Sequence, residues 1–237
     1  MKKRIQIDSS ILSFAIILTG ILYLFPSLYP RSPFWDNICD FIGLMLVLKG
    51  TFLRMAARGF KKIHSKKSKD LVTEGPYTLT RNPMYLGSFL MGAGFVLIVW
   101  PFWFLPVFAY LFYLRFNKEI VKEEGYLTEI FGDRYKQYCR KVPRLFPKLK
   151  KLINVDVREA LPLEACWNTK EKRGLFWWPV LAVLLEVFQE NIIFGGTDVK
   201  RVISLFVFAM AVFAIGGVIR YTLFPKLKFN VKKSKTL

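Results

Sequence analysis

Charged residues are missing from long stretches of this sequence. Three runs, residues 9–30, 82–114 and 202–219, contain no Asp, Glu, Lys or Arg in a chain of 237 residues. Because a helix that crosses a bilayer needs about 20 mostly apolar residues, these runs predict membrane-spanning helices and an integral membrane protein. The first run also lacks the small-residue cleavage site of a signal peptide, so we expect it to be retained.

Acidic residues are few compared with basic ones. The chain has 36 Lys and Arg against 17 Asp and Glu, which gives a net charge of +19. In a soluble protein this excess would suggest a nucleic-acid partner. Here the charge lies between the apolar runs, as in the basic cytoplasmic loops of membrane proteins, which face anionic lipid headgroups. We therefore expect membrane lipids, and no nucleic acid, as partners.

Cysteine and histidine are scarce as well. The three cysteines, Cys39, Cys139 and Cys166, have neither metal-binding nor disulfide spacing, and we expect them to be packing residues. His64 is the only histidine and lies in a basic segment, where a solvated loop residue is a better interpretation than a general base. Because the sequence shows no cluster of ligand residues, we expect no bound metal.

Two acidic residues stand at the end of an otherwise apolar segment. Glu186 and Glu190 are spaced i, i+4 near the end of 175–194. An acid inside a membrane segment is a functional candidate by default. Because the surrounding residues, EVFQEN, lie close to the predicted outer interface, we interpret the pair as a solvated helix end.

The apolar pattern predicts an all-α polytopic membrane protein with about six spans. They lie near 11–30, 37–57, 84–99, 102–115, 175–194 and 202–223. The run 82–114 is too long for one upright helix, has Pro101 near its midpoint, and is flanked by basic residues on both sides. Both flanks should therefore be cytoplasmic, which predicts a helical hairpin at 84–115. Basic residues at both termini place these in the cytoplasm too.

Turn-forming residues are concentrated where the chain enters this hairpin, in GPYTLTRNPMYLG at 75–87. Gly75-Pro76 and Asn82-Pro83 are turn signals, and each proline disfavours helix at the residue before it. Irregular backbone at membrane depth is tolerated only where protein or a watery cavity surrounds it. Such backbone could hold a polar ligand; the alternative is that the stretch only caps a helix.

A second segment, 117–147, has an approximately helical apolar period that is broken near Gly132. This pattern predicts an amphipathic helix along the membrane surface. Glu123 and Glu124 lie shortly after the apolar run and either form an exposed face or turn inward against a cation.

The two segments together resemble a known family. LVTEGPYTLTRNPMYLG followed by EEGYLTEIFGDRYKQYCRKVPRLFP is similar to the isoprenylcysteine carboxyl methyltransferase and phospholipid methyltransferase family. The resemblance covers residues 69–147, which we expect to form a methyltransferase-like core within a single membrane domain, 1–237. Outside the resemblance, the apolar runs of 151–237 predict a further membrane hairpin. Members of the family are membrane enzymes that bind S-adenosylmethionine in a cytoplasmic pocket over the hairpin, while a lipophilic substrate enters from the bilayer.

The resemblance assigns roles to particular residues. Cofactor contacts would be Lys69, Asp70, Leu71, Val72, Tyr77, Asn82, Pro83, Met84, Tyr85 and Glu123. Substrate-side candidates are Arg81, Glu119 and Glu124. The family usually has histidine in place of Asn82, whose amide still donates and accepts hydrogen bonds. Prenylcysteine enzymes have arginine in place of Glu119, so a cationic or amine substrate fits this chain better than a carboxylate.

The expected function is methyl transfer from S-adenosylmethionine to a lipophilic acceptor at the cytoplasmic membrane face, by in-line displacement. Two alternatives remain. A membrane NADPH-dependent sterol-type reductase would have a similar RxPxY entrance, and a non-catalytic scaffold could bind anionic lipid through basic loops. The EExxL…FGDRY continuation favours the methyltransferase, and a scaffold would not need the turn chemistry of 75–87. The identity of the methyl acceptor stays open.

Overall fold

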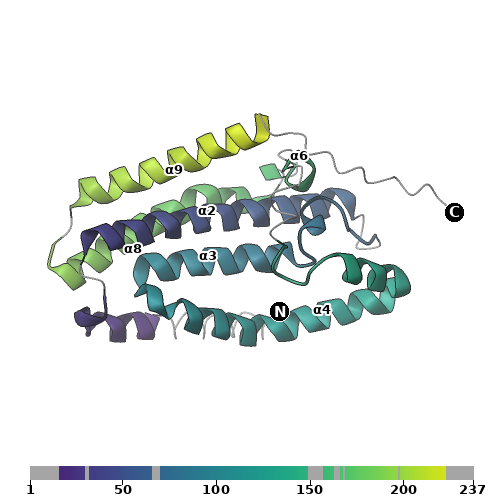
Figure 1. Cartoon of the computed structure of the whole chain (residues 1–237), viewed down its shortest axis with the longest axis horizontal. Helices are drawn as coiled ribbons and strands as arrows, with labels where there is room; N and C mark the ends of the chain where they lie inside the picture. Colours follow the sequence, from purple (N-terminus) through teal and green to yellow (C-terminus); the bar gives the residue numbers. More distant parts are fainter. Residues whose placement is uncertain are drawn as a thin grey trace.

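The structure is a computed structural model that describes residues 16–29, 32–65, 70–148, 157–162, 166–167, 169–196 and 198–222. Every regular element in these ranges is a helix (Figure 1), which confirms the predicted all-α class. The long helices run roughly along the longest axis of the molecule (Figure 1). Any site in this fold is therefore built between helices or at their ends.

Helix α2 (Pro33–His64) is the central element and contacts three other long helices. It begins at a proline, whose missing N–H costs nothing in the first turn of a helix. Its last turn contains Lys61 and Lys62, whose charges suit the negative end of the helix dipole. At 1.5 Å per residue its 32 residues extend for about 48 Å, so the helix connects both ends of the bundle.

Helices α2 and α3 (Pro83–Val99) approach each other through glycines. A Cβ atom on Gly50 would lie 2.5 Å from the carbonyl oxygen of Gly87, and one on Gly43 would lie 2.8 Å from that of Gly94. Small residues let helix backbones approach closely in membranes, where apolar burial alone does not drive association. This contact fixes the start of α3 against the second half of α2.

The uncharged run 82–114 folds back on itself, as predicted. Helix α3 ends at Val99, the chain turns through η4 (Phe102–Phe104), and α4 (Leu105–Lys141) returns beside α3 (Figure 1). Helix α4 extends well beyond the predicted span end at 115, because the apolar arm and the amphipathic segment form one long helix. It kinks at Gly132, with φ 51° and ψ −125°, where the apolar period of the sequence is also broken.

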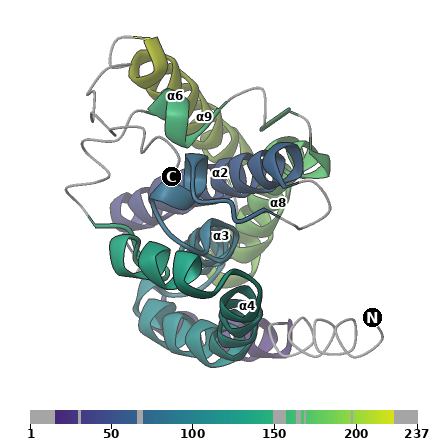
Figure 2. The ribbon, with the colours of Figure 1, turned by 90° about the vertical axis from the view of Figure 1, so that its right-hand side faces the viewer.

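The C-terminal part forms a second hairpin. Helix α8 (Gly174–Phe194) follows the short η5 (Lys170–Arg173) and ends at Gly195. Gly195 has a φ of 74°, in the left-handed region that commonly ends helices and that glycine adopts most easily. Helix α9 (Val199–Thr222) then returns, and both helices contact α2 (Figure 2). The pair lies within 151–237, and its role as an additional membrane hairpin stays a prediction.

The remaining elements are short: helical residues 16–23, η1 (Pro26–Leu28) and α6 (Val157–Ala160). Among the described residues, two helices are long and apolar enough to cross a membrane, Lys170–Ile193 and Val199–Ile219. Helix α3 is apolar but shorter. The predicted count of about six spans therefore stays a prediction.

Apolar side chains are found on both the inside and the outside of the bundle. Leu44 and Ile98 are buried between α2, α3 and the C-terminal hairpin. Phe176, Trp177 and Phe208 are each at least 60% exposed. Large exposed apolar surfaces mark contact with a membrane or a partner, which agrees with the apolar runs of the sequence.

The interpretation of Glu186 and Glu190 as a solvated helix end is wrong. Their exposed fractions are 0% and 3%, and both side chains lie within the bundle. Glu190 forms an ion pair with Arg201 of α9. The two acids therefore belong to the interior contacts between helices.

Candidate functional site

A cavity of about 560 Å³ lies where the second half of α2, the turn before α3, the start of α3 and the middle of α4 meet. Its lining residues are Arg54, Lys61, Tyr77, Arg81, Asn82, Pro83, Met84, Tyr85, Ser88, Phe116, Glu119, Lys122, Glu123 and Tyr126. Sites for small ligands and cofactors usually measure about 300–1,000 Å³. The cavity is therefore large enough for a ligand of cofactor size.

The backbone before α3 is irregular, as the turn signals predict. Gly75 opens a 3₁₀ turn, η3 (Gly75–Thr78), with a φ of 59°. A Cβ at this position would lie 2.7 Å from ring atoms of Phe60 on α2, so both the backbone angle and the space require glycine. Asn82 has φ −124° and ψ 60°, outside the helical region, as expected for a residue before proline.

Hydrogen bonds connect this turn to the end of α4. The Arg81 N–H donates to the Pro143 carbonyl at 2.9 Å. The Thr80 hydroxyl and the Asn82 amide both donate to the Arg144 carbonyl, at 3.1 and 3.0 Å. The two halves of the sequence pattern, 75–87 and 117–147, are thus parts of one structure.

A buried tyrosine cluster supports the same connection. The Tyr138 hydroxyl donates to the Tyr77 carbonyl at 2.7 Å. Burial, and then the charges of neighbouring tyrosines, raises the pKa of Tyr138. Burial, together with the carboxylate of Glu123, raises the pKa of Tyr77. Both hydroxyls therefore stay protonated at neutral pH and remain hydrogen-bond donors.

The paired acids Glu123 and Glu124 have different surroundings. The Glu124 side chain is 18% exposed and lies 3.4 Å from Arg81 and 3.2 Å from Arg144. The Asn82 amide also donates to it, at 3.4 Å. Of the two alternatives left open by the sequence, Glu124 takes the inward one, against cations. Glu124 therefore connects α4 to the turn before α3 and to the N-terminal end of α3.

Glu123 lines the cavity instead. Its side chain is 41% exposed, and a carboxylate oxygen lies 3.7 Å from the Lys61 ammonium of α2. One turn earlier, Glu119 also lines the cavity and lies 3.9 Å from Arg115. Glu119 and Glu123 therefore form an acidic face of α4 that borders the cavity.

The cavity as a whole is nevertheless not acidic. Four of its lining residues are basic, Arg54, Lys61, Arg81 and Lys122, against two acids. The Arg81 guanidinium is held by Glu124. Burial lowers the pKa of Arg81, but Glu124 together with Cys139 and Tyr135 outweighs this effect, so that the pKa is raised. The charges of the cavity therefore do not single out the cationic or amine substrate that Glu119 suggests.

Most of the predicted site residues come together here. Six predicted cofactor residues line the cavity: Tyr77, Asn82, Pro83, Met84, Tyr85 and Glu123. Arg81 and Glu119 do so as well, and Glu124 lies behind them. Asp70, Leu71 and Val72 precede the turn and are not among the lining residues; Leu71 packs against the tyrosine cluster. Lys69 lies outside the described residues.

Sequence reasoning missed the contribution of α2. Arg54 and Lys61 line the cavity, and the Arg54 guanidinium donates to the Ser88 hydroxyl of α3. Arg54 also lies 3.2 Å from Glu171. The sequence did contain a signal for this contribution. Arg54 places a charge in an apolar segment, and Lys61, seven residues later, lies on the same face of a helix.

Aromatic side chains form the other wall. Tyr85 and Phe116 meet edge to face with their ring centroids 5.6 Å apart, and the tilted rings of Phe112 and Phe116 have centroids 4.3 Å apart. Tyr85 and Phe116 line the cavity. The arrangement combines flat apolar surfaces, which suit a planar ring or an organic cation, with charged groups of both signs.

Comparison with known proteins gives consistent results. A family model described as phospholipid methyltransferase matches residues 38–134. The protein-S-isoprenylcysteine O-methyltransferase of Schizosaccharomyces pombe is 36% identical over 119 residues, which cover 49% of this chain and 50% of that protein. A probable protein-S-isoprenylcysteine O-methyltransferase of Oryza sativa subsp. indica is 31% identical over 141 residues, 55% of this chain and 71% of that protein.

The protein-S-isoprenylcysteine O-methyltransferase of Saccharomyces cerevisiae is 34% identical over 140 residues, 55% of this chain and 59% of that protein. The matched region thus spans from about half to about seven tenths of these relatives. No solved structure matches the chain significantly. The match to the family model begins within α2, ends within α4 and contains every residue that lines the cavity.

Proposed function

The chain belongs to the phospholipid methyltransferase family, and from this premise we propose that it transfers a methyl group from S-adenosylmethionine to a lipophilic acceptor at the cytoplasmic face of a membrane. One observation carries the proposal. The cavity over the α3–α4 hairpin is lined by six of the residues that the family pattern assigns to the cofactor. The reductase and scaffold alternatives have no comparable support.

The lining residues fit the chemical groups of the cofactor. The carboxylate of Glu123 suits its amine or its ribose hydroxyls, and the bases of α2, Arg54 and Lys61, suit its carboxylate. The rings of Tyr85 and Phe116 offer a flat surface for adenine and an attractive one for the sulfonium. When bound, the cofactor supplies an electrophilic methyl group.

The protein's own contribution is alignment and exclusion of water. In-line displacement needs no metal or strong base if the acceptor is ionised or carries a free electron pair. Holding two reactants in line supplies about 7–11 kcal/mol of the barrier. Hydrogen bonds from Arg81 and Asn82 to the residues after α4 hold the turn before α3 in place. The ion pairs of Glu124 with Arg81 and Arg144 connect α4 to the same turn.

The acceptor that fits the charges best is a lipophilic carboxylate, such as that of a prenylated cysteine. Four bases line the cavity, and the relatives are named for O-methylation of such a group. Glu119 favours a second candidate, a lipid amine, since it borders the cavity with only a weak contact to Arg115. Which candidate is correct depends on whether Glu119 or the bases face the reacting group.

The membrane arrangement follows from the same proposal. The arms of the α3–α4 hairpin cross the bilayer, both termini are cytoplasmic, and 1–237 forms one membrane domain in which the α8–α9 hairpin completes the wall behind α2. The apolar α8 and α9 and the exposed aromatic side chains support this arrangement. The acceptor's lipid chain would then reach the cavity between helices, from the bilayer.

Calorimetric titration of the purified full chain tests the proposal. S-adenosylhomocysteine, the product form of the cofactor, should bind with one site per chain, and NADPH should give no binding heat. Binding of NADPH alone would overturn the proposal in favour of the reductase. Absence of binding by both would favour the scaffold.

A further inference from the structure

Acidic side chains gather at the end of the bundle opposite the cavity. Asp36 and Asp40 lie in the first two turns of α2, and Glu186 and Glu190 lie on the second half of α8. We call these four residues the acidic cluster. Arg54, the cavity residue closest to it along α2, lies about 21 Å from Asp40 at 1.5 Å per residue. The cluster is therefore separate from the proposed methyl-transfer site.

The cluster is buried and short of positive charge. The exposed fractions of Asp36, Asp40, Glu186 and Glu190 are 8%, 1%, 0% and 3%. Among the ion pairs of the described residues, one reaches the cluster, from Arg201 to Glu190. A single guanidinium cannot neutralise four carboxylates, and buried ions need a partner to offset their desolvation. Either protons or a cation must supply the missing charge.

Two carboxylate oxygens point to a missing ligand. Oδ2 of Asp40 and Oε1 of Glu186 are buried and have no hydrogen-bond partner among the described residues. With its amide oriented to donate, Gln189 holds Oε2 of Glu186 at 2.9 Å and the Ile98 carbonyl at 3.2 Å. That contact orients Glu186 and leaves its Oε1 available.

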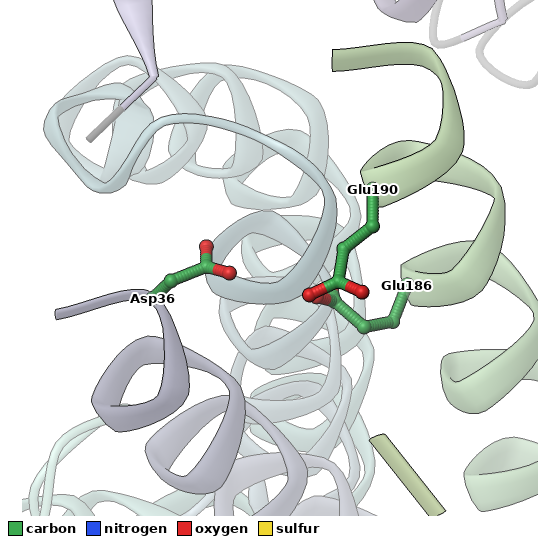
Figure 3. A group of neighbouring side chains, drawn as sticks. All are labelled: Asp36, Glu186 and Glu190. Carbon is green, nitrogen blue, oxygen red and sulfur yellow. The ribbon is translucent and has the colours of Figure 1, made fainter. Parts of the chain in front are cut away.

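The geometry fits a metal ion. One carboxylate oxygen each from Asp36, Glu186 and Glu190 lies within 4.8 Å of the others, and Figure 3 shows the three side chains converging from α2 and α8. Oxygen ligands at 2.3–2.6 Å from Ca²⁺ can be up to about 5 Å apart. The donors are all oxygen, and no Cys or His of the described residues joins the group. Hard cations prefer such donors.

We propose that the acidic cluster binds one hard divalent cation, with Ca²⁺ preferred over Mg²⁺. Asp36, Glu186 and Glu190 are its ligands, and the carboxylate of Asp40 adds charge or a fourth ligand. Ca²⁺ tolerates an irregular set of carboxylates, whereas Mg²⁺ demands octahedral geometry and keeps several waters, for which a buried cluster has little room. The bound cation connects α2 to α8 and, through Glu190 and Arg201, to α9. This proposal departs from the sequence-based expectation of no bound metal, which stays a prediction.

Direct binding measurement tests the proposal. The purified full chain, stripped with EDTA in detergent, is dialysed against ⁴⁵Ca²⁺, with a protein-free detergent sample as the blank. Wild type should bind one equivalent above the blank. The Asp36→Asn/Glu186→Gln variant should bind at least about tenfold more weakly, since each lost charge-assisted contact is worth about tenfold or more. Asp133→Asn, which changes a carboxylate 87% exposed on α4, is the matched control and should bind like wild type.

Two outcomes would overturn the proposal. Wild type that binds no Ca²⁺ above the blank would show that protons neutralise the cluster, and this result needs no variant. Equal binding by wild type and the double variant would place the ion elsewhere. If the double variant does not fold, Asp36→Asn alone is used, because Asp36 lies in the first turn of α2 and is the least buried of the four.

A thermal measurement separates this inference from the proposed function. Ca²⁺ should raise the unfolding temperature of wild type and of Asp133→Asn but not that of the double variant, because a ligand that binds only the folded state stabilises it. S-adenosylhomocysteine affinity should be the same with and without Ca²⁺. Unfolding temperatures of wild type that do not respond to Ca²⁺ would contradict a cation that connects the helices, whatever the result for the cofactor.

Discussion

Replacing Glu123 by glutamine removes the one acid of the pair that lines the cavity while keeping its size. In the proposed complex this carboxylate accepts hydrogen bonds from the cofactor, and a hydrogen bond to a charged group is worth about 1.5–3 kcal/mol. Because the Glu123 side chain is 41% exposed, solvent screening favours the lower end of this range. Since about 1.4 kcal/mol corresponds to tenfold in affinity, we expect S-adenosylhomocysteine to bind about tenfold more weakly.

The assay is calorimetric titration with S-adenosylhomocysteine, together with the unfolding temperature of each variant. Glu129→Gln is the matched control, because Glu129 is an exposed acid on the same helix and is not among the lining residues. It should bind like wild type. Glu123→Gln should keep a nearly unchanged unfolding temperature, since its contact to Lys61 is long and exposed. Wild-type affinity in a folded Glu123→Gln variant would refute the assignment of this residue to the cofactor.

Three further changes test other parts of the account. Gly75→Ala should lower both affinity and unfolding temperature, because a φ of 59° costs a non-glycine residue about 1–2 kcal/mol and the new Cβ would contact the Phe60 ring at 2.7 Å; normal binding would make the turn a simple helix cap. Glu124→Gln should destabilise the fold by about 1.5–3 kcal/mol in thermal unfolding, since two guanidiniums lose their anion; an unchanged unfolding temperature would contradict this. In a cysteine-free background, Phe102→Cys should be protected from, and Lys67→Cys open to, a reagent confined to the cytoplasmic side; the same labelling at both would contradict the hairpin topology.

The hairpin and its entrance could be predicted because their signals are local. An uncharged run too long for one helix, with Pro101 near its middle, defines two antiparallel helices. Gly75 and Pro83 restrict their own backbone and that of their neighbours, and the structure has the expected irregular turn there. The length of α4 was harder to predict, because a helical period looks the same whether or not the helix continues from the bilayer.

Contacts between distant segments could not be predicted. The close approach of α2 and α3 depends on glycines paired across two helices, and nothing in either helix alone identifies its partner. Glu186 looked like a solvated helix end because its neighbours in the bundle, including Asp40, come from the other end of the sequence. Lys61 lines the cavity from α2, which lies outside the segment 69–147 that carries the family resemblance. The cavity is therefore more basic than the acids of α4 indicated.

Methyl transfer itself is the most direct test of the central claim. The purified chain is incubated with S-adenosylmethionine labelled in its methyl group, together with either a farnesylcysteine analogue or total membrane lipid. The account predicts label on the farnesylcysteine analogue as a base-labile ester, reduced in Glu123→Gln at limiting cofactor and retained in Glu129→Gln. Label only on lipid amines would make the Glu119-favoured acceptor the correct one, and no label on either acceptor from a chain that binds S-adenosylhomocysteine poorly would contradict the claim that this protein is a methyltransferase.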